Sequence, residues 1–88
     1  MNYVLFTYPS CRKCLEMKAH LAGLAVSAEV LDVADKEGRT RIRTFLPHIK
    51  RDEKGAIRLP TLVGLENGEV VTVVNSPEEL TAWLRSRG

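Results

Sequence analysis

The first third of the chain predicts a strand, a helix and a second strand in succession, and this order limits the folds that are open to it. Residues 3–7 form a short apolar, β-prone run without alternation, which is typical of a strand covered on both faces. Apolar residues at helical spacing follow over 11–25, with Ser10 as the expected N-cap, and 26–34 is again β-prone. Such a unit almost always joins two parallel strands by a right-handed crossover. We therefore expect an α/β fold.

The middle of the chain predicts a second helix and a charged connection. The helix begins near Asp35 and ends at Pro47, and Gly38 weakens its first turn. The stretch 48–58 then carries four basic side chains against two acidic ones, and 52–55 suits a turn that would make a small hairpin. We interpret this stretch as a solvated surface loop, with a partner-docking element as the alternative.

The last third predicts a hairpin and a closing helix. Asn67-Gly68 stands between the β-prone runs 61–63 and 70–74, a strong signal for a tight antiparallel turn. Ser76 suits the N-cap and Pro77 the first helical position. The predicted order is β-α-β-α-β-β-α, with a four-stranded mixed sheet and helices on both faces.

The composition favours one small domain and excludes several classes of protein. A chain of 88 residues buries about 60 to 65% of the surface that its unfolded form exposes, so we expect a single domain over 1–88. With 13 basic and 11 acidic residues the formal charge is only +2, unlike that of a dedicated nucleic-acid binder. No apolar run approaches the roughly 20 residues of a membrane helix, and the start lacks a basic leader. We expect a cytoplasmic monomer that binds neither nucleic acid nor membranes.

Cys11 and Cys14, the only cysteines, stand at the start of the first predicted helix. Residues three apart on a helix have Cα atoms about 5 to 6 Å apart, which a disulfide requires. The helix dipole favours the Cys11 thiolate, and Arg12 and Lys13 add two positive charges. We predict that Cys11 attacks a substrate disulfide and that Cys14, deeper and on the packed face, resolves the mixed disulfide.

Two other interpretations of the cysteine pair compete with redox chemistry. Half of a zinc site is one, but His20 and His48 lack zinc-finger spacing, and we expect no metal. A structural disulfide closing so short a loop would constrain little chain. With this pair upstream and a hairpin downstream, we also expect a cis Leu59–Pro60 peptide bond, a trans proline at a strand boundary being the alternative.

Together these residues resemble the glutaredoxin branch of the thioredoxin superfamily, over essentially the whole chain. The motifs are Tyr8 to Cys14, Leu59-Pro60-Thr61, and Asn75 to Leu80 at the last helix. The resemblance implies a thioredoxin-like, glutaredoxin-type fold and a thiol-disulfide oxidoreductase acting on protein or glutathione mixed disulfides. It implies that the backbone of Leu59, before cis-Pro60, binds the substrate as in β-augmentation. It also implies no tightly bound cofactor, with glutathione as a possible co-substrate.

The chain departs from this family at the glutathione-binding positions. Arg12-Lys13 replace the usual Pro-Tyr, and Tyr8 stands where a Lys or Arg commonly holds a glutathione carboxylate. Asn75-Ser76 replace Gly-Gly, and Pro77 has no N–H for the γ-glutamyl carboxylate. Glu78 matches an acid that receives the γ-glutamyl ammonium, and Ser76 has a hydroxyl to donate, although both also suit helix capping. We expect weakened glutathione recognition.

Three other functions stay open at this point. The first is a glutaredoxin-like electron carrier that thioredoxin reductase, rather than glutathione, reduces. The second is a metal-binding module in which Cys11 from two chains bridges an iron–sulfur cluster. The third is a redox-inert adaptor that has kept the fold.

Overall fold

A computed structural model, which describes residues 1–87, confirms the predicted order of elements. Its four strands form one sheet in the order β2-β1-β3-β4. Strand β1 pairs in parallel with β2 and antiparallel with β3, which also pairs antiparallel with β4, so the sheet is mixed and β1 is central. The strands are β1 (Asn2–Thr7), β2 (Glu29–Asp32), β3 (Thr61–Glu66) and β4 (Glu69–Val74).

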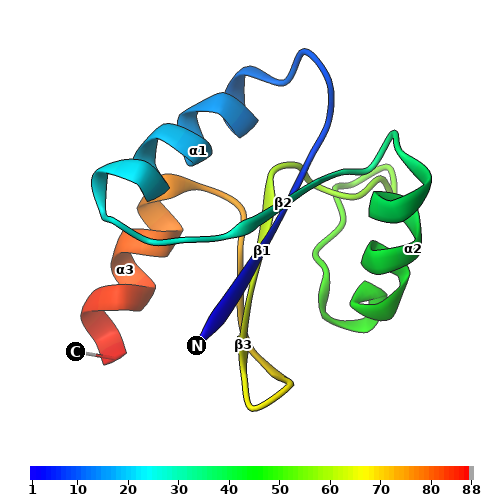
Figure 1. The fold of residues 1–88 in the computed structure, drawn as a ribbon. Helices are drawn as coiled ribbons and strands as arrows, with labels where there is room; N and C mark the ends of the chain where they lie inside the picture. Colours follow the sequence, from blue (N-terminus) through cyan, green and yellow to red (C-terminus); the bar gives the residue numbers. More distant parts are fainter. Residues whose placement is uncertain (88) are drawn as a thin grey trace.

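Helices cover both faces of this sheet, as predicted (Figure 1). Helices α1 (Arg12–Gly23) and α3 (Pro77–Arg87) lie on one face. Helix α2 (Lys36–Thr44) and the short 3-10 helix η1 (Leu46–His48) lie on the other. Among residues 1–87, no helix is both long enough and apolar enough to span a membrane.

Strand β1 is buried on both faces, which explains its unbroken apolar run. Phe6 packs in one core with Ile42 and Phe45 from the α2 side. Leu5 packs in the opposite core with side chains of α1 and α3, among them Met17. A buried side chain of this size stabilises the fold by roughly 1.5 to 3 kcal/mol, so a two-sided central strand anchors both layers.

The boundaries of α1 differ from the predicted ones. Ser10 has φ 61°, a left-handed conformation that an N-cap residue does not adopt, and Cys11 with extended backbone is the N-cap instead. At the other end α1 stops at Gly23, and Ala25 has φ 56°. Cys11 is therefore held at the helix entrance, not inside its first turn.

Strand β2 is shorter than the predicted run 26–34. It is an edge strand that pairs only with β1, and Val30 on it is 47% exposed. Val33 lies beyond its end, where its N–H donates to the carbonyl of Thr7 at 2.9 Å. The β-prone composition thus extends on both sides beyond the four residues, Glu29–Asp32, that pair in register with β1.

Gly38 is a requirement of the packing and not a weak point of α2, as its helix propensity had suggested. It is buried, and a Cβ built on it would lie 2.0 Å from the carbonyl oxygen of Asp32. Helix α2 thus approaches the end of β2 backbone to backbone. The helix also ends at Thr44, earlier than predicted, and Pro47 lies within η1.

Candidate redox site

The topology gathers the predicted motifs at one end of the sheet. Strand β1 ends just before the cysteines, and its Phe6 pairs with Thr61, the first residue of antiparallel β3. Strand β4 returns to the same end, because its last residue, Val74, pairs with Leu62. The cysteines, the segment before β3 and the start of α3 are therefore neighbours, although they are far apart in the chain.

Cys11 and Cys14 form a disulfide, with their Cα atoms 5.2 Å apart, inside the predicted range. Cys11 is the N-cap of α1. Its Sγ accepts a hydrogen bond from the backbone N–H of Cys14, and the nitrogen lies 3.1 Å from the sulfur. Cys14 is only 2% exposed, whereas Cys11 is half-buried. An incoming thiol or disulfide thus has easier access to the Cys11 sulfur than to that of Cys14.

The peptide bond between Leu59 and Pro60 is cis, as predicted. Pro60 is fully buried and Leu59 is half-buried. Strand β3 begins at Thr61, directly after Pro60. The backbone of Leu59 therefore lies at the end of the sheet that also carries the disulfide.

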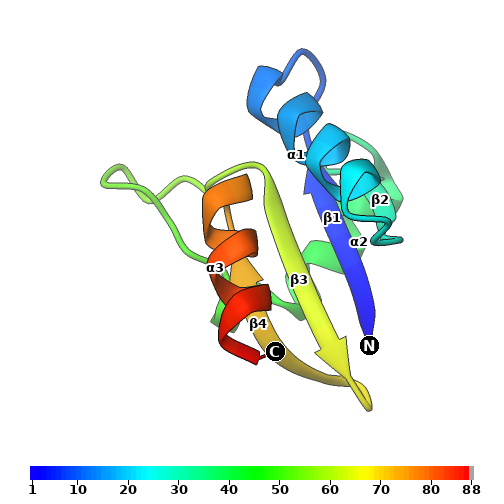
Figure 2. The ribbon, with the colours of Figure 1, turned by 90° about the vertical axis from the view of Figure 1, so that its left-hand side faces the viewer.

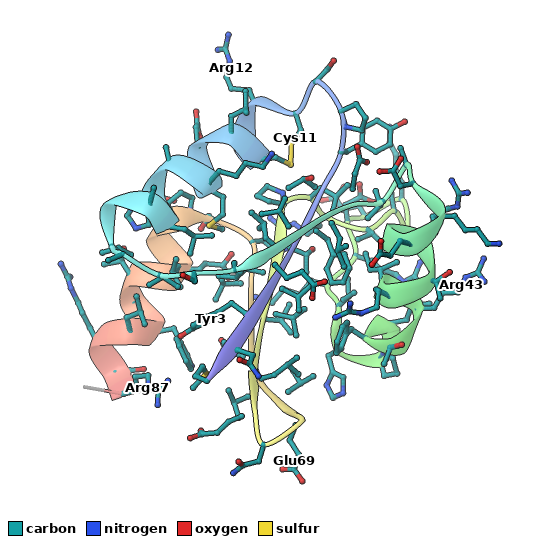
Figure 3. The ribbon with its side chains drawn as sticks, viewed as in Figure 1. Tyr3, Cys11, Arg12, Arg43, Glu69 and Arg87 are labelled. Carbon is teal, nitrogen blue, oxygen red and sulfur yellow. A yellow bond between two sulfur atoms is a disulfide. The ribbon has the colours of Figure 1, made fainter. Side chains whose placement is uncertain are left out.

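A hollow of about 260 Å³ lies between α1 and the start of α3. It brings together three of the predicted site residues, Lys13, Ser76 and Glu78. Arg12 and Tyr8 do not line it: Arg12 extends outward from the start of α1 in Figure 3, away from the Cys11 sulfur. Tyr8 is 55% exposed. The other residues that line the hollow are Glu16, Arg58, Asn75, Pro77 and Glu79.

Helix α3 begins as predicted, with a capping arrangement. The Glu79 backbone N–H donates to the Ser76 Oγ at 3.1 Å. In return, the Glu79 Oε1 accepts the backbone N–H of Asn75 at 3.1 Å. This reciprocal pairing is a variant of the capping box, shifted by one residue on its second bond. Ser76 is therefore already used as an acceptor within the fold.

Glu79 also ties the helix start to the loop that precedes cis-Pro60. Its Oε2 lies 2.9 Å from the Lys50 Nζ. Burial opposes ionisation of this carboxyl, but the bonds from Lys50 and from the Asn75 N–H outweigh it and, with the charge of Arg58, hold the pKa of Glu79 below its usual value. The carboxylate is thus charged at neutral pH and keeps its partners.

From the sequence, Asn75 stands only in place of a family glycine, but in the structure it binds the segment around cis-Pro60 and lines the hollow. Its side-chain Nδ2 lies 3.1 Å from the Arg58 carbonyl oxygen, 3.0 Å from that of Pro60 and 3.1 Å from the Thr61 Oγ1. These acceptors are 14 to 17 positions earlier in the chain. An Asn directly before the expected N-cap Ser76 is the one signal in the sequence, and it does not identify the partners.

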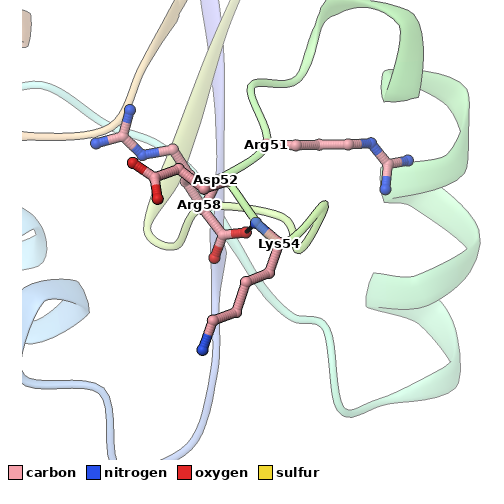
Figure 4. A pocket seen from close by; sticks show the side chains of 5 residues that line it. Arg51, Asp52, Lys54 and Arg58 are labelled. Carbon is pink, nitrogen blue, oxygen red and sulfur yellow. Dashed lines mark hydrogen bonds between the residues drawn. The ribbon is translucent and has the colours of Figure 1, made fainter.

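The predicted turn in the stretch 48–58 is present, and Figure 2 shows this segment projecting from the sheet. Arg51 and Ile57 form an antiparallel bridge, and the Asp52 Oδ1 accepts the N–H groups of Lys54 and Ala56. Basic and acidic side chains share a hollow of about 540 Å³ here (Figure 4). Residues 50–56 are exposed, as expected of a solvated surface loop, and docking of a partner here stays the untested alternative.

The described residues contain no group of three or more His, Cys, Asp or Glu side chains arranged to hold a metal ion. His20, one of the two histidines considered as zinc ligands, instead has its Nε2 2.9 Å from the Thr81 Oγ1 and joins α1 to α3.

No protein-family model matches this sequence, and no curated protein is significantly similar to it. Solved structures do match. The crystal structure of the thioredoxin-like protein BC3987 has a TM-score of 0.62 and 27% identity, over 92% of this chain and 97% of that one. A point mutant of the same protein gives 0.64 and 26%, over 94% and 99%. The fold is thioredoxin-like. With Cys11 and Cys14 at disulfide distance, this thioredoxin-like fold is consistent with a redox function.

Proposed function

We propose that the protein is a glutaredoxin-like thiol-disulfide oxidoreductase that reduces mixed disulfides of proteins or of glutathione. The observation that carries this proposal is the position of the pair: a half-buried Cys11 sulfur at the start of α1, bonded to a buried Cys14, at the same sheet end as cis-Pro60. We propose that it acts as a cytoplasmic monomer on disulfide-containing proteins.

The two cysteines supply the two electrons of the reaction. In the reduced protein, the Cys11 thiolate attacks one sulfur of the substrate disulfide, forms a mixed disulfide and releases the other sulfur as a thiolate, which takes up a proton. Cys14 then loses its proton and attacks the Cys11 sulfur. This step forms the Cys11–Cys14 disulfide and releases the second substrate thiol. Glutathione or thioredoxin reductase then returns two electrons to the pair.

In the reduced protein, the pKa of the Cys11 thiol should lie below the usual cysteine value of about 8.5. The N-terminus of α1 and the Cys14 N–H, 3.1 Å from the Cys11 Sγ in the disulfide, both favour the thiolate. The measurement is thiolate ultraviolet absorbance against pH in the Cys14→Ser variant, which leaves one thiol. A pKa at or above the usual value would refute the electrostatic argument.

The start of α3 favours thioredoxin reductase as a second candidate for the electron source. In glutaredoxins a backbone N–H at the position of Pro77 binds the γ-glutamyl carboxylate, and proline has none. The Ser76 hydroxyl, which the resemblance offers as a substitute donor, already donates to the Glu79 Oε1 at 3.5 Å. Glutathione therefore has fewer donors to bind, whereas a reductase that docks as a protein does not need them.

A coupled assay tests both the activity and the electron source. NADPH oxidation is followed with a mixed-disulfide substrate, using either glutathione with glutathione reductase or thioredoxin reductase. We expect turnover, and we expect Pro77→Ala, which restores one N–H, to lower the KM for glutathione by about two- to tenfold. Turnover driven by thioredoxin reductase should not respond to this substitution. Absence of turnover with both reductants would contradict the proposed function.

A further inference from the structure

Asn75 holds the backbone on both sides of Leu59. The Nδ2 of Asn75 donates to the carbonyl oxygen of Arg58, before Leu59, and to that of Pro60, after it, at 3.1 and 3.0 Å. The Thr61 hydroxyl adds a second bond to the Arg58 carbonyl oxygen and lies 3.1 Å from the same Nδ2. The segment that leads into β3 is thus held by side chains at each end.

The backbone of Leu59 lies between these two held carbonyl groups and is itself free to bind a substrate. Among residues 1–87, no hydrogen bond engages its N–H or its carbonyl oxygen, and the side chain is half-buried. An extended peptide can pair with such a free backbone unit as an added strand. The flanking carbonyl oxygens of Arg58 and Pro60, by contrast, already accept hydrogen bonds from Asn75. The N–H and carbonyl oxygen of Leu59 are therefore the backbone groups that a substrate peptide can bind.

The surroundings of Asn75 indicate that its amide serves this segment. Asn75 is only 8% exposed, and its buried Oδ1 has no hydrogen-bond partner among residues 1–87, which is an unfavourable state for a polar atom. All side-chain bonds of Asn75 are donated by Nδ2 to the segment 58–61. Glu79 fixes its backbone N–H, and Lys50 in turn holds Glu79.

We propose that Asn75 is a positioning residue that presents the Leu59 backbone to an extended peptide segment of the substrate. This inference rests on the proposed function and names its substrate class: disulfides flanked by extended polypeptide. A small disulfide without a peptide backbone reacts at the Cys11 sulfur without using this contact. The two substrate types therefore separate the role of Asn75 from the chemistry of the cysteines.

The test compares single-turnover rates of the reduced protein with a disulfide-linked peptide and with bis(2-hydroxyethyl) disulfide, so that no reductase is needed. Asn75→Ala should lower the second-order rate constant for the peptide by about 5- to 50-fold, because the segment is misplaced. The rate with the small disulfide should stay within about twofold, since its path does not involve Leu59. Asn2→Ala, the same change at the opposite, exposed end of β1, is the matched control and should alter neither rate.

Thr61→Val provides a second variant of nearly unchanged shape, should the alanine variant fold poorly. It removes the hydroxyl bond to the Arg58 carbonyl and keeps Asn75, so a smaller selective loss with the peptide is expected. Equal losses with both substrates, or no loss with the peptide, in a folded variant would overturn the role of Asn75. A wild-type protein that reacts with neither disulfide would instead overturn the proposed function.

Discussion

Cys11→Ser should lower the rate of disulfide reduction at least about a thousandfold, because the half-buried Cys11 sulfur is the proposed attacking group. A serine hydroxyl at the start of α1 keeps the N-cap but is not ionised at neutral pH and cannot form the mixed disulfide. The measurement is turnover in the coupled assay, with circular dichroism to show that the variant is folded. Near wild-type turnover would mean that Cys11 is not the nucleophile.

Cys14→Ser is the matched variant, because it removes the buried sulfur and leaves Cys11 in place. The first attack should still occur, whereas the second step has no thiol to perform it. A covalent adduct between Cys11 and the substrate should then accumulate and be visible by intact-mass spectrometry. The opposite pattern, with the adduct on Cys14 in the Cys11 variant, would reverse the assigned order.

Gly38→Ala should have the largest effect on stability. The added Cβ would lie 2.0 Å from the Asp32 carbonyl oxygen and 2.6 Å from its carbon, and both atoms are backbone that cannot turn aside. The better helix propensity of alanine returns only about 1 kcal/mol. We expect a net loss of about 3 kcal/mol in the free energy of unfolding, or roughly 10 to 20 °C in Tm.

Gly23→Ala is the control for that experiment. Gly23 is the last residue of α1, but no atom of the described residues lies within 4 Å of a Cβ built there. Alanine at this position should be neutral or stabilise the fold by up to about 1 kcal/mol. Urea unfolding of both variants measures the difference, and similar midpoints would show that α2 does not need the close approach at Gly38.

The features that were predicted correctly depend on neighbouring residues. The run 3–7 identified a strand buried on both faces, Asn67-Gly68 the hairpin, and Ser76 the cap of α3, because strand burial, turn type and capping are each encoded within a few residues. The C-x-x-C spacing likewise predicted a Cα separation that the structure has. Local geometry determines all of these.

The features that the sequence did not predict depend on the path of the backbone and on contacts between segments that are distant in the chain. The residue type of Ser10 suits an N-cap, but the path of the chain after β1 gives Cys11 that place. Gly38 is unfavourable by helix propensity, whereas the structure places the end of β2 directly against it. Residue type indicates which local conformations a position favours, but it does not specify which distant segment the position contacts.

The sequence by itself therefore determined the order of strands and helices and the position of the cysteine pair, and it predicted the cis Leu59–Pro60 bond, since each depends on a short stretch of chain. Only the tertiary structure decided that the Asn75 side chain donates to the carbonyl oxygens on both sides of Leu59. Those relations join segments up to 17 residues apart through hydrogen bonds whose partners no local pattern specifies. They exist because the sheet brings three chain segments to one end.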